Sequence, residues 1–124
     1  MSNQVLVVDD DPLMHRLFKH HFERAGYQLL SATNGREALD IAAREHPGLI
    51  VMDVMMPEVD GLAALRELKK ADDTKTIPVI VITANPLPVV SKESGNAGGA
   101  VFMTKPFSPA QLLKEIQRLL PLAS

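Results

Sequence analysis

The sequence contains no cysteine, which excludes disulfide bonds, thiolate metal sites and cysteine nucleophiles. It has no apolar run long enough to cross a membrane, and Met1-Ser2-Asn3-Gln4 lacks the basic start and apolar stretch of a signal peptide. The formal net charge is only −2, so no basic excess suggests nucleic-acid binding. We therefore expect a cytoplasmic protein that binds neither nucleic acid nor membrane through these residues.

The remaining composition is typical of a globular domain. The chain has 124 residues, of which 46% are apolar and 23% charged, enough to bury a substantial core. We find no internal repeat, linker or low-complexity segment, and we expect residues 1–124 to form one domain.

Short apolar runs alternate with helical patterns along the chain. The runs are Val5–Val8, Gln28–Ala32, Leu49–Met52, Val79–Thr83 and Val101–Thr104. Most are nearly uninterrupted, as expected for strands that are covered on both faces of a parallel sheet, whereas the more polar second run fits an edge. This alternation predicts a doubly wound α/β domain with a five-stranded parallel sheet.

The predicted helices carry apolar stripes and capping signals. The first has a stripe that ends near Gly26 and consists of Leu13, Leu17, Phe18 and Phe22. Asn34 and Glu37 form a capping-box pair for the second helix. A leucine stripe marks the third helix, and Ser108-Pro109 is an N-cap with a first-turn proline for the last one.

The segment between the fourth and fifth strands departs from this pattern. A crossover helix is expected there, but Pro86 and Pro88 permit at most a helix start. Poor helix formers follow, and each Gly costs up to about 1 kcal/mol relative to Ala. We predict that this fourth helix is short, frayed or partly irregular, and that phosphate or a partner orders it.

Three consecutive aspartates, Asp9, Asp10 and Asp11, follow the first apolar run. Packed carboxylates at the end of a buried strand repel each other and lose hydration, which is unfavourable unless a cation binds. The same residues also fit a turn and helix start, because Asp11-Pro12 is a favourable N-cap and first-turn pair. The aspartates alone leave both interpretations open.

Polar residues also lie at the ends of the other strands. Because the carboxyl ends of parallel strands share one edge, we expect Asp9, Asp10, Asp53, Thr83 and Lys105 to converge there, where open α/β sheets bind ligands. Such an oxygen-rich, anionic set suits Mg²⁺ and would repel the phosphate of a flavin. A carboxylate beside Mg²⁺ and lysine can act as a nucleophile and form an aspartyl-phosphate.

The segments that carry these residues resemble the motifs of response-regulator receiver domains. They are Val7-Val8-Asp9-Asp10-Asp11, Asp53-Val54-Met55-Met56-Pro57 with Asp60-Gly61, Thr83-Ala84 and Thr104-Lys105-Pro106-Phe107. The resemblance covers essentially the whole chain. It implies a flavodoxin/CheY-like fold with strand order 2-1-3-4-5, in which the weak fourth helix is atypical.

The resemblance also implies the metal site and the phosphoacceptor. Asp53 would accept a phosphoryl group from a phosphohistidine on a sensor histidine kinase or a histidine phosphotransfer protein. Mg²⁺ would be held by Asp10, by Asp53 and by the backbone carbonyl of Met55, with Asp9 acting mainly through a metal-bound water. The downstream protein partner is left open, as is the formation of a homodimer.

The remaining implied roles concern phosphoryl binding and switching. Lys105, Thr83 and Ala84 would contact the phosphoryl group, because its transfer needs cancellation of charge on the equatorial oxygens. Thr83 and Phe102 would then switch, changing the face formed by the fourth helix, the fifth strand and the fifth helix. The alternatives are a surface lysine at Lys105, a strand-favouring residue at Thr83 and a permanently buried ring at Phe102.

Two other functions compete with a phosphorylated switch. One is a phosphorylation-independent interaction module of the same fold, which the unusual fourth-helix segment keeps open. The other is a Mg²⁺-dependent phosphohydrolase, for which so short a chain has no cap region. We expect no turnover of a free substrate, and we expect the four histidines to be surface or boundary residues.

Overall fold

The computed structural model describes residues 3–53, 61–72, 74–83, 101–104 and 108–121. For residues 53, 61–65, 83, 101–102 and 104 it describes the backbone alone. Every helix in the described part of the chain is too short or too polar to span a membrane. The predicted irregular fourth helix falls within residues 84–100, which lie outside the described part of the chain.

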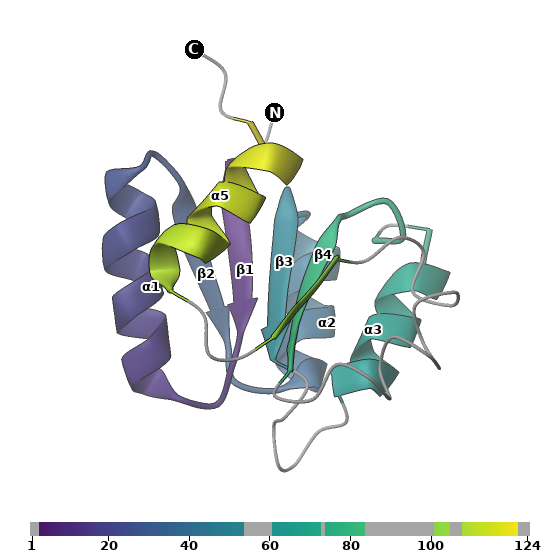
Figure 1. The fold of residues 1–124 in the computed structure, drawn as a ribbon. Helices are drawn as coiled ribbons and strands as arrows, with labels where there is room; N and C mark the ends of the chain where they lie inside the picture. Colours follow the sequence, from purple (N-terminus) through teal and green to yellow (C-terminus); the bar gives the residue numbers. More distant parts are fainter. Residues whose placement is uncertain (1–2, 54–60, 73, 84–100, 105–107, 122–124) are drawn as a thin grey trace.

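Strands and helices alternate along the described chain as the sequence predicts (Figure 1). The strands are β1 (Gln4–Val8), β2 (Gln28–Ala32), β3 (Leu49–Asp53), β4 (Val79–Thr83) and β5 (Val101–Thr104). The helices are α1 (Pro12–Arg24), α2 (Gly35–Glu45), α3 (Gly61–Lys70) and α5 (Pro109–Leu119). The strands form one parallel sheet in the order β2-β1-β3-β4-β5, which confirms the predicted order and the edge position of β2.

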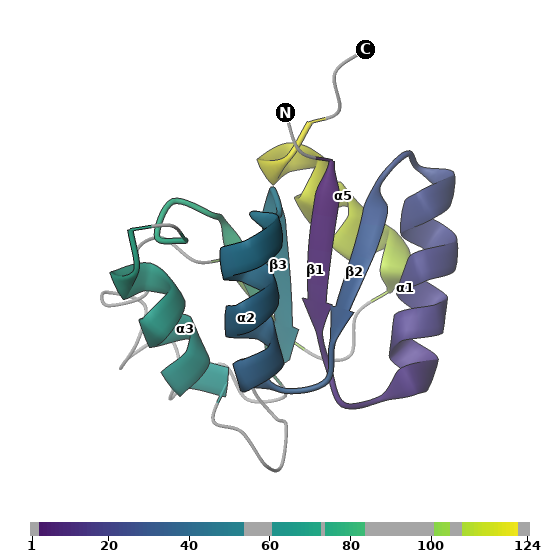
Figure 2. The ribbon, with the colours of Figure 1, turned by 180° about the vertical axis from the view of Figure 1, so that it is seen from behind.

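Helices cover both faces of the sheet. Figures 1 and 2 show α1 and α5 on one face and α2 and α3 on the other. Successive residues of a strand point to opposite faces, so β1 contributes Leu6 to the core beneath α2 and α3, and Val5 to the core beneath α1 and α5. This two-sided burial explains why the central strands are apolar without interruption.

The first helix differs from its predicted apolar stripe. Phe18 and Phe22 are buried, and their rings stack with centroids 5.3 Å apart. Leu13 and Leu17, which belong to the same predicted stripe, are 67% and 40% exposed. The prediction was wrong for these two leucines, because α1 packs Met14, Phe18 and Phe22, which are spaced four residues apart, against the core. The helix ends before Gly26, whose positive φ of 101° favours glycine.

The second helix begins with a variant of the predicted capping box. Asn34 is the N-cap, and its Oδ1 accepts a hydrogen bond from the Glu37 amide at 2.9 Å. The Glu37 carboxylate, however, accepts from the Thr33 amide and the Thr33 hydroxyl, both at 2.7 Å, instead of from Asn34. Thr33 offers two donors to one carboxylate oxygen, which explains the preference. Ser108 is the predicted N-cap of α5, and it also forms a full capping box with Gln111, in which both reciprocal bonds are present.

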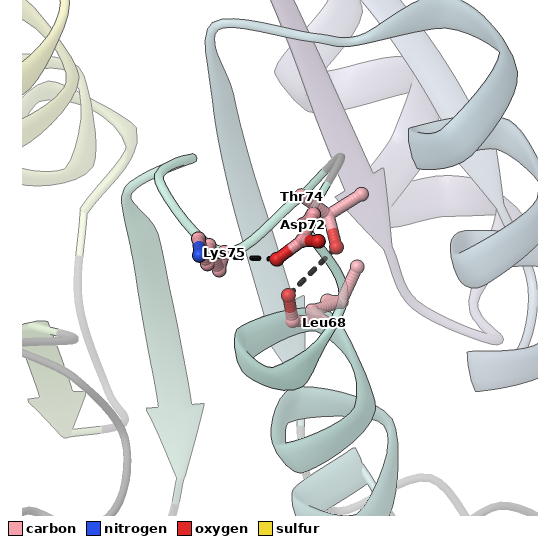
Figure 3. A network of polar contacts seen from close by, with 4 residues as sticks. All are labelled: Leu68, Asp72, Thr74 and Lys75. Carbon is pink, nitrogen blue, oxygen red and sulfur yellow. Dashed lines mark hydrogen bonds and ion pairs between the residues drawn. The ribbon is translucent and has the colours of Figure 1, made fainter.

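A short polar network connects α3 to β4 (Figure 3). The buried Thr74 donates its hydroxyl to the Leu68 carbonyl at 2.6 Å, which satisfies a carbonyl in the last turn of the helix. Lys75 forms an exposed ion pair with Asp72 at 3.1 Å. Lys69 donates to the Ile77 carbonyl at 2.8 Å, and burial lowers the pKa of this lysine. These bonds fix the chain as it enters β4, whose carboxyl end leads to Thr83.

Tyr27 links the start of β2 to the end of α5. Its buried side chain donates a hydrogen bond to the Leu120 carbonyl at 2.7 Å, across 93 residues of sequence. We expect Tyr27→Phe to lower the free energy of unfolding by about 1 kcal/mol, because the carbonyl loses its partner. Urea unfolding monitored by circular dichroism measures this change, and an unchanged midpoint would show that the bond adds no net stability.

Candidate functional site

The carboxyl end of β1 carries the first part of the candidate site. The Asp9 amide donates to the Ala32 carbonyl of β2 at 3.0 Å, so the residue extends the sheet beyond β1. Its side chain is nearly buried, with 6% of the residue exposed, and its Oδ1 accepts a hydrogen bond from the Asp11 amide at 2.9 Å. Asp10, between them, is exposed to solvent. The first two aspartates therefore differ: one is held within the protein and one faces water.

Asp11 begins the first helix. It is the N-cap of α1, its Oδ1 accepts from the Leu13 amide at 2.9 Å, and Pro12 occupies the first turn. The helix-start interpretation is confirmed for Asp11, whereas the cation site at Asp9 and Asp10 stays a prediction. This capping bond also fixes the direction in which the chain leaves the site.

The sheet register brings the other predicted residues to the same edge. Val8 of β1 pairs with Met52 of β3. Asp9 directly follows Val8 and Asp53 directly follows Met52, so the two aspartates continue from the same paired position. The backbone of Asp53 pairs with Ile82, the residue before Thr83. The register therefore brings the backbones of Asp9, Asp53 and Thr83 to the same edge.

The predicted switch positions are also neighbours in the sheet. Thr83 pairs with Thr104, and Phe102 lies two register positions earlier on β5. The side chains of Asp53, Thr83 and Phe102 lie outside the described atoms, and Met55, Ala84 and Lys105 lie outside the described residues. The roles of these six residues stay predictions.

His15 takes part in the site in a way that the sequence did not predict. Its Nε2 lies 2.6 Å from the Asp9 carbonyl oxygen. A carbonyl only accepts hydrogen bonds, so Nε2 carries the hydrogen and donates. His15 is half-buried and so lies at the boundary of the core, as expected of the histidines. Its contact with Asp9 depends on how α1 packs back against the end of β1. His20 and His21 are exposed on α1.

Glu37 adds a negative charge beside this edge. The pKa of the Glu37 carboxyl lies below its ordinary value. The largest cause is the hydrogen bond from the Thr33 amide, followed by that from the Thr33 hydroxyl, and the nearby His15 also lowers the pKa. Glu37 therefore stays ionised at neutral pH. Among the described residues, it adds a third carboxylate to those of Asp9 and Asp10 at this end of the sheet.

The described donors fit a hard divalent cation. They are carboxylate oxygens without sulfur, and one of them is held in a fixed orientation by a backbone amide. Among the residues with described side chains no three His, Asp or Glu side chains form a metal site. A third carboxylate would come from Asp53, which the register places on the strand next to Asp9.

Comparison with known proteins identifies relatives along nearly the whole chain. The family model "Response regulator receiver domain" matches residues 5–117. The polar-differentiation response regulator DivK of Brucella ovis is 34% identical over 120 residues, which make up 97% of this chain and 98% of DivK. The probable transcriptional regulator ycf27 of Porphyridium aerugineum is 38% identical over 120 residues, or 96% of this chain. The chain spans only 48% of that ycf27 protein, about half its length.

Solved structures show the same fold. The chemotaxis protein CheY4 of Vibrio cholerae has a TM-score of 0.86 and 32% identity, covering 97% of this chain and all of CheY4. The receiver domain of a sensor histidine kinase from Pseudomonas aeruginosa, with magnesium in its active-site cleft, has a TM-score of 0.82 and 28% identity, covering 96% of this chain and 98% of that one.

A third structure is TrrA of Thermotoga maritima, solved in complex with Mg²⁺ and BeF, with a TM-score of 0.81 and 31% identity. It covers 97% of this chain and all of TrrA. The family match over residues 5–117 agrees with the sheet order and with the aspartates that follow β1. This chain belongs to the response regulator receiver domain family of two-component signalling.

Proposed function

We propose that this domain accepts a phosphoryl group on Asp53 from a phosphohistidine donor and signals by changing shape. The observation that carries the proposal is the sheet register, in which Val8 pairs with Met52, so that Asp9 and the backbone of Asp53 directly follow a paired position on β1 and β3. In transfer, an Asp53 carboxylate oxygen bonds to phosphorus while the bond from phosphorus to the donor imidazole breaks. The imidazole nitrogen leaves with the electron pair of that bond.

Asp9 and Asp10, with Asp53 and the Met55 carbonyl, would hold Mg²⁺. Bound Mg²⁺ would cancel charge on these carboxylates and on the phosphoryl oxygens. The chain's own residues supply the rest: the buried Asp9 is preset by the Asp11 amide, and Asp10 is open to solvent for cation entry. The magnesium in the structures of the Pseudomonas kinase receiver and of TrrA supports this assignment.

Lys105, Thr83 and Ala84 would bind the phosphoryl oxygens, and Thr83 would pass the change to Phe102. The register supports this last step, because Thr83 and Phe102 lie two positions apart on paired strands β4 and β5. The domain would act on itself and would not turn over a free substrate. Its donor would be a sensor histidine kinase or a histidine phosphotransfer protein, and its readout a downstream protein.

Substitution of Asp10 tests the cation requirement. We expect Asp10→Asn to slow formation of the phosphoryl adduct from acetyl phosphate at least about tenfold at limiting Mg²⁺, because loss of a charged ligand weakens metal binding. Intact-protein mass spectrometry over time measures the rate. Asp72→Asn, an exposed aspartate in the α3–β4 connection, is the matched control and should react like the wild type. Equal rates for Asp10→Asn and wild type would contradict the metal assignment.

A further inference from the structure

Three hydrogen bonds hold Asp9 from three directions. Its amide donates to Ala32 of β2, its Oδ1 accepts from the Asp11 amide, and its carbonyl accepts from His15 of α1. The first two bonds fix the strand end and the Asp9 side chain. The third acts on the peptide group that joins Asp9 to Asp10. Because a peptide group is planar, fixing the carbonyl of Asp9 also orients the amide and the Cα of Asp10.

We propose that His15 is a positioning residue for the cation site, whose Nε2–H bond to the Asp9 carbonyl presets the backbone from which the Asp10 carboxylate reaches Mg²⁺. This inference rests on the proposed function of the same site. His15 does not touch the cation. It acts through the Asp9–Asp10 peptide, in the way that outer groups orient the ligands of other metal sites.

The surroundings of the ring argue against a purely structural role. His15 Nδ1 is buried and has no hydrogen-bond partner among the described residues. Burying an unpartnered nitrogen is unfavourable, so an apolar side chain would suit the packing of this position better. Within the described part of the chain, the hydrogen bond of the ring is that of 2.6 Å from Nε2 to the Asp9 carbonyl. The hydrogen bond from Nε2 to the Asp9 carbonyl therefore accounts for a histidine at this position better than the packing of its ring does.

Two substitutions separate the donor from the bulk of the ring. His15→Leu fills space without a donor, whereas His15→Gln keeps an N–H group that can reach the same carbonyl. His20→Leu is the matched control, because His20 is an exposed histidine on the same helix. The probe is MgCl₂ added to the ¹⁵N-labelled full chain, and the readout is the dissociation constant from the amide shifts of residues 9–11.

We expect His15→Leu to raise the Mg²⁺ dissociation constant by about tenfold or more, and His15→Gln to stay within about threefold of wild type. His20→Leu should bind like the wild type. If His15→Leu does not fold, His15→Met, which also lacks a donor, replaces it in the same comparison. Rescue by glutamine is the result that a merely structural role would not produce.

Three results would overturn the inference. Wild-type affinity in His15→Leu, alongside weakened binding in Asp10→Asn, would overturn the role of His15 and leave the proposed cation site intact. Equal loss in His15→Leu and His15→Gln would show that the ring's shape matters and its donor does not. Absence of Mg²⁺-dependent shifts in the wild type would overturn both this inference and the proposed function.

Discussion

Replacing Asp53 by alanine is expected to abolish the phosphoryl adduct that the wild-type chain acquires from acetyl phosphate and Mg²⁺. Alanine has no oxygen that can attack phosphorus, so the loss should be complete and not merely a slower reaction. Asp9 is not expected to replace it, because Asp9 is nearly buried and bonded to the Asp11 amide. Intact-protein mass after incubation with and without Mg²⁺ measures the result, with one adduct expected per wild-type chain.

The matched control is Asp40→Ala, because Asp40 is an exposed aspartate on α2. It should acquire the adduct at the wild-type rate. An adduct on the Asp53→Ala chain would place the phosphoacceptor elsewhere. If the wild type binds Mg²⁺ but acquires no adduct, the phosphorylation-independent interaction module becomes the better description of the domain.

The second large effect concerns the core between the sheet and α5. Leu112 is fully buried in the cluster that contains Phe18, Phe22 and Ile116. We expect Leu112→Ala to lower the free energy of unfolding by about 2–5 kcal/mol, because the substitution removes buried apolar surface and leaves a cavity. That is a large share of the roughly 5–15 kcal/mol that stabilises a typical domain. Chemical denaturation monitored by circular dichroism measures the difference.

Leu13→Ala provides the comparison for that substitution. Leu13 is also a helical leucine, but 67% of it is exposed on α1. We expect its replacement to change the free energy of unfolding by no more than about 0.5 kcal/mol. A small loss of stability in both variants would mean that α5 does not pack on the sheet as described. A large loss in both would mean that the exposed Leu13 has a structural role.

The sheet could be predicted closely because its central strands are covered on both faces. An uninterrupted apolar run such as Leu49–Met52 is typical of a strand that is buried on both faces, and the observed β3 is only one residue longer than this run. The helices were harder, because periodicity indicates a stripe but not which of its residues face the sheet. Leu13 and Leu17 match the spacing of Phe18 and Phe22, yet α1 packs Met14 and the two aromatic residues against the core and leaves both leucines exposed.

The candidate site was predictable to the extent that it depends on strand ends. Asp9 and Asp53 each follow a buried run, and parallel pairing alone brings their backbones to one edge. The contact of His15 with Asp9 was not predictable, because it depends on the angle at which α1 leaves its Asp11 cap. The partner of Glu37 was not predictable either, since a capping box pairs this carboxylate with the Asn34 amide, whereas Thr33 provides both of the observed donors.

The bond between Tyr27 and Leu120 has a practical consequence. It joins the end of α5 to the start of β2, at the edge of the sheet from which β1 also starts (Figure 1). The aspartates lie at the opposite edge, where β1 ends. Attachment of the domain to a surface through the end that carries Tyr27 and Leu120 would therefore leave the exposed Asp10 facing the solution.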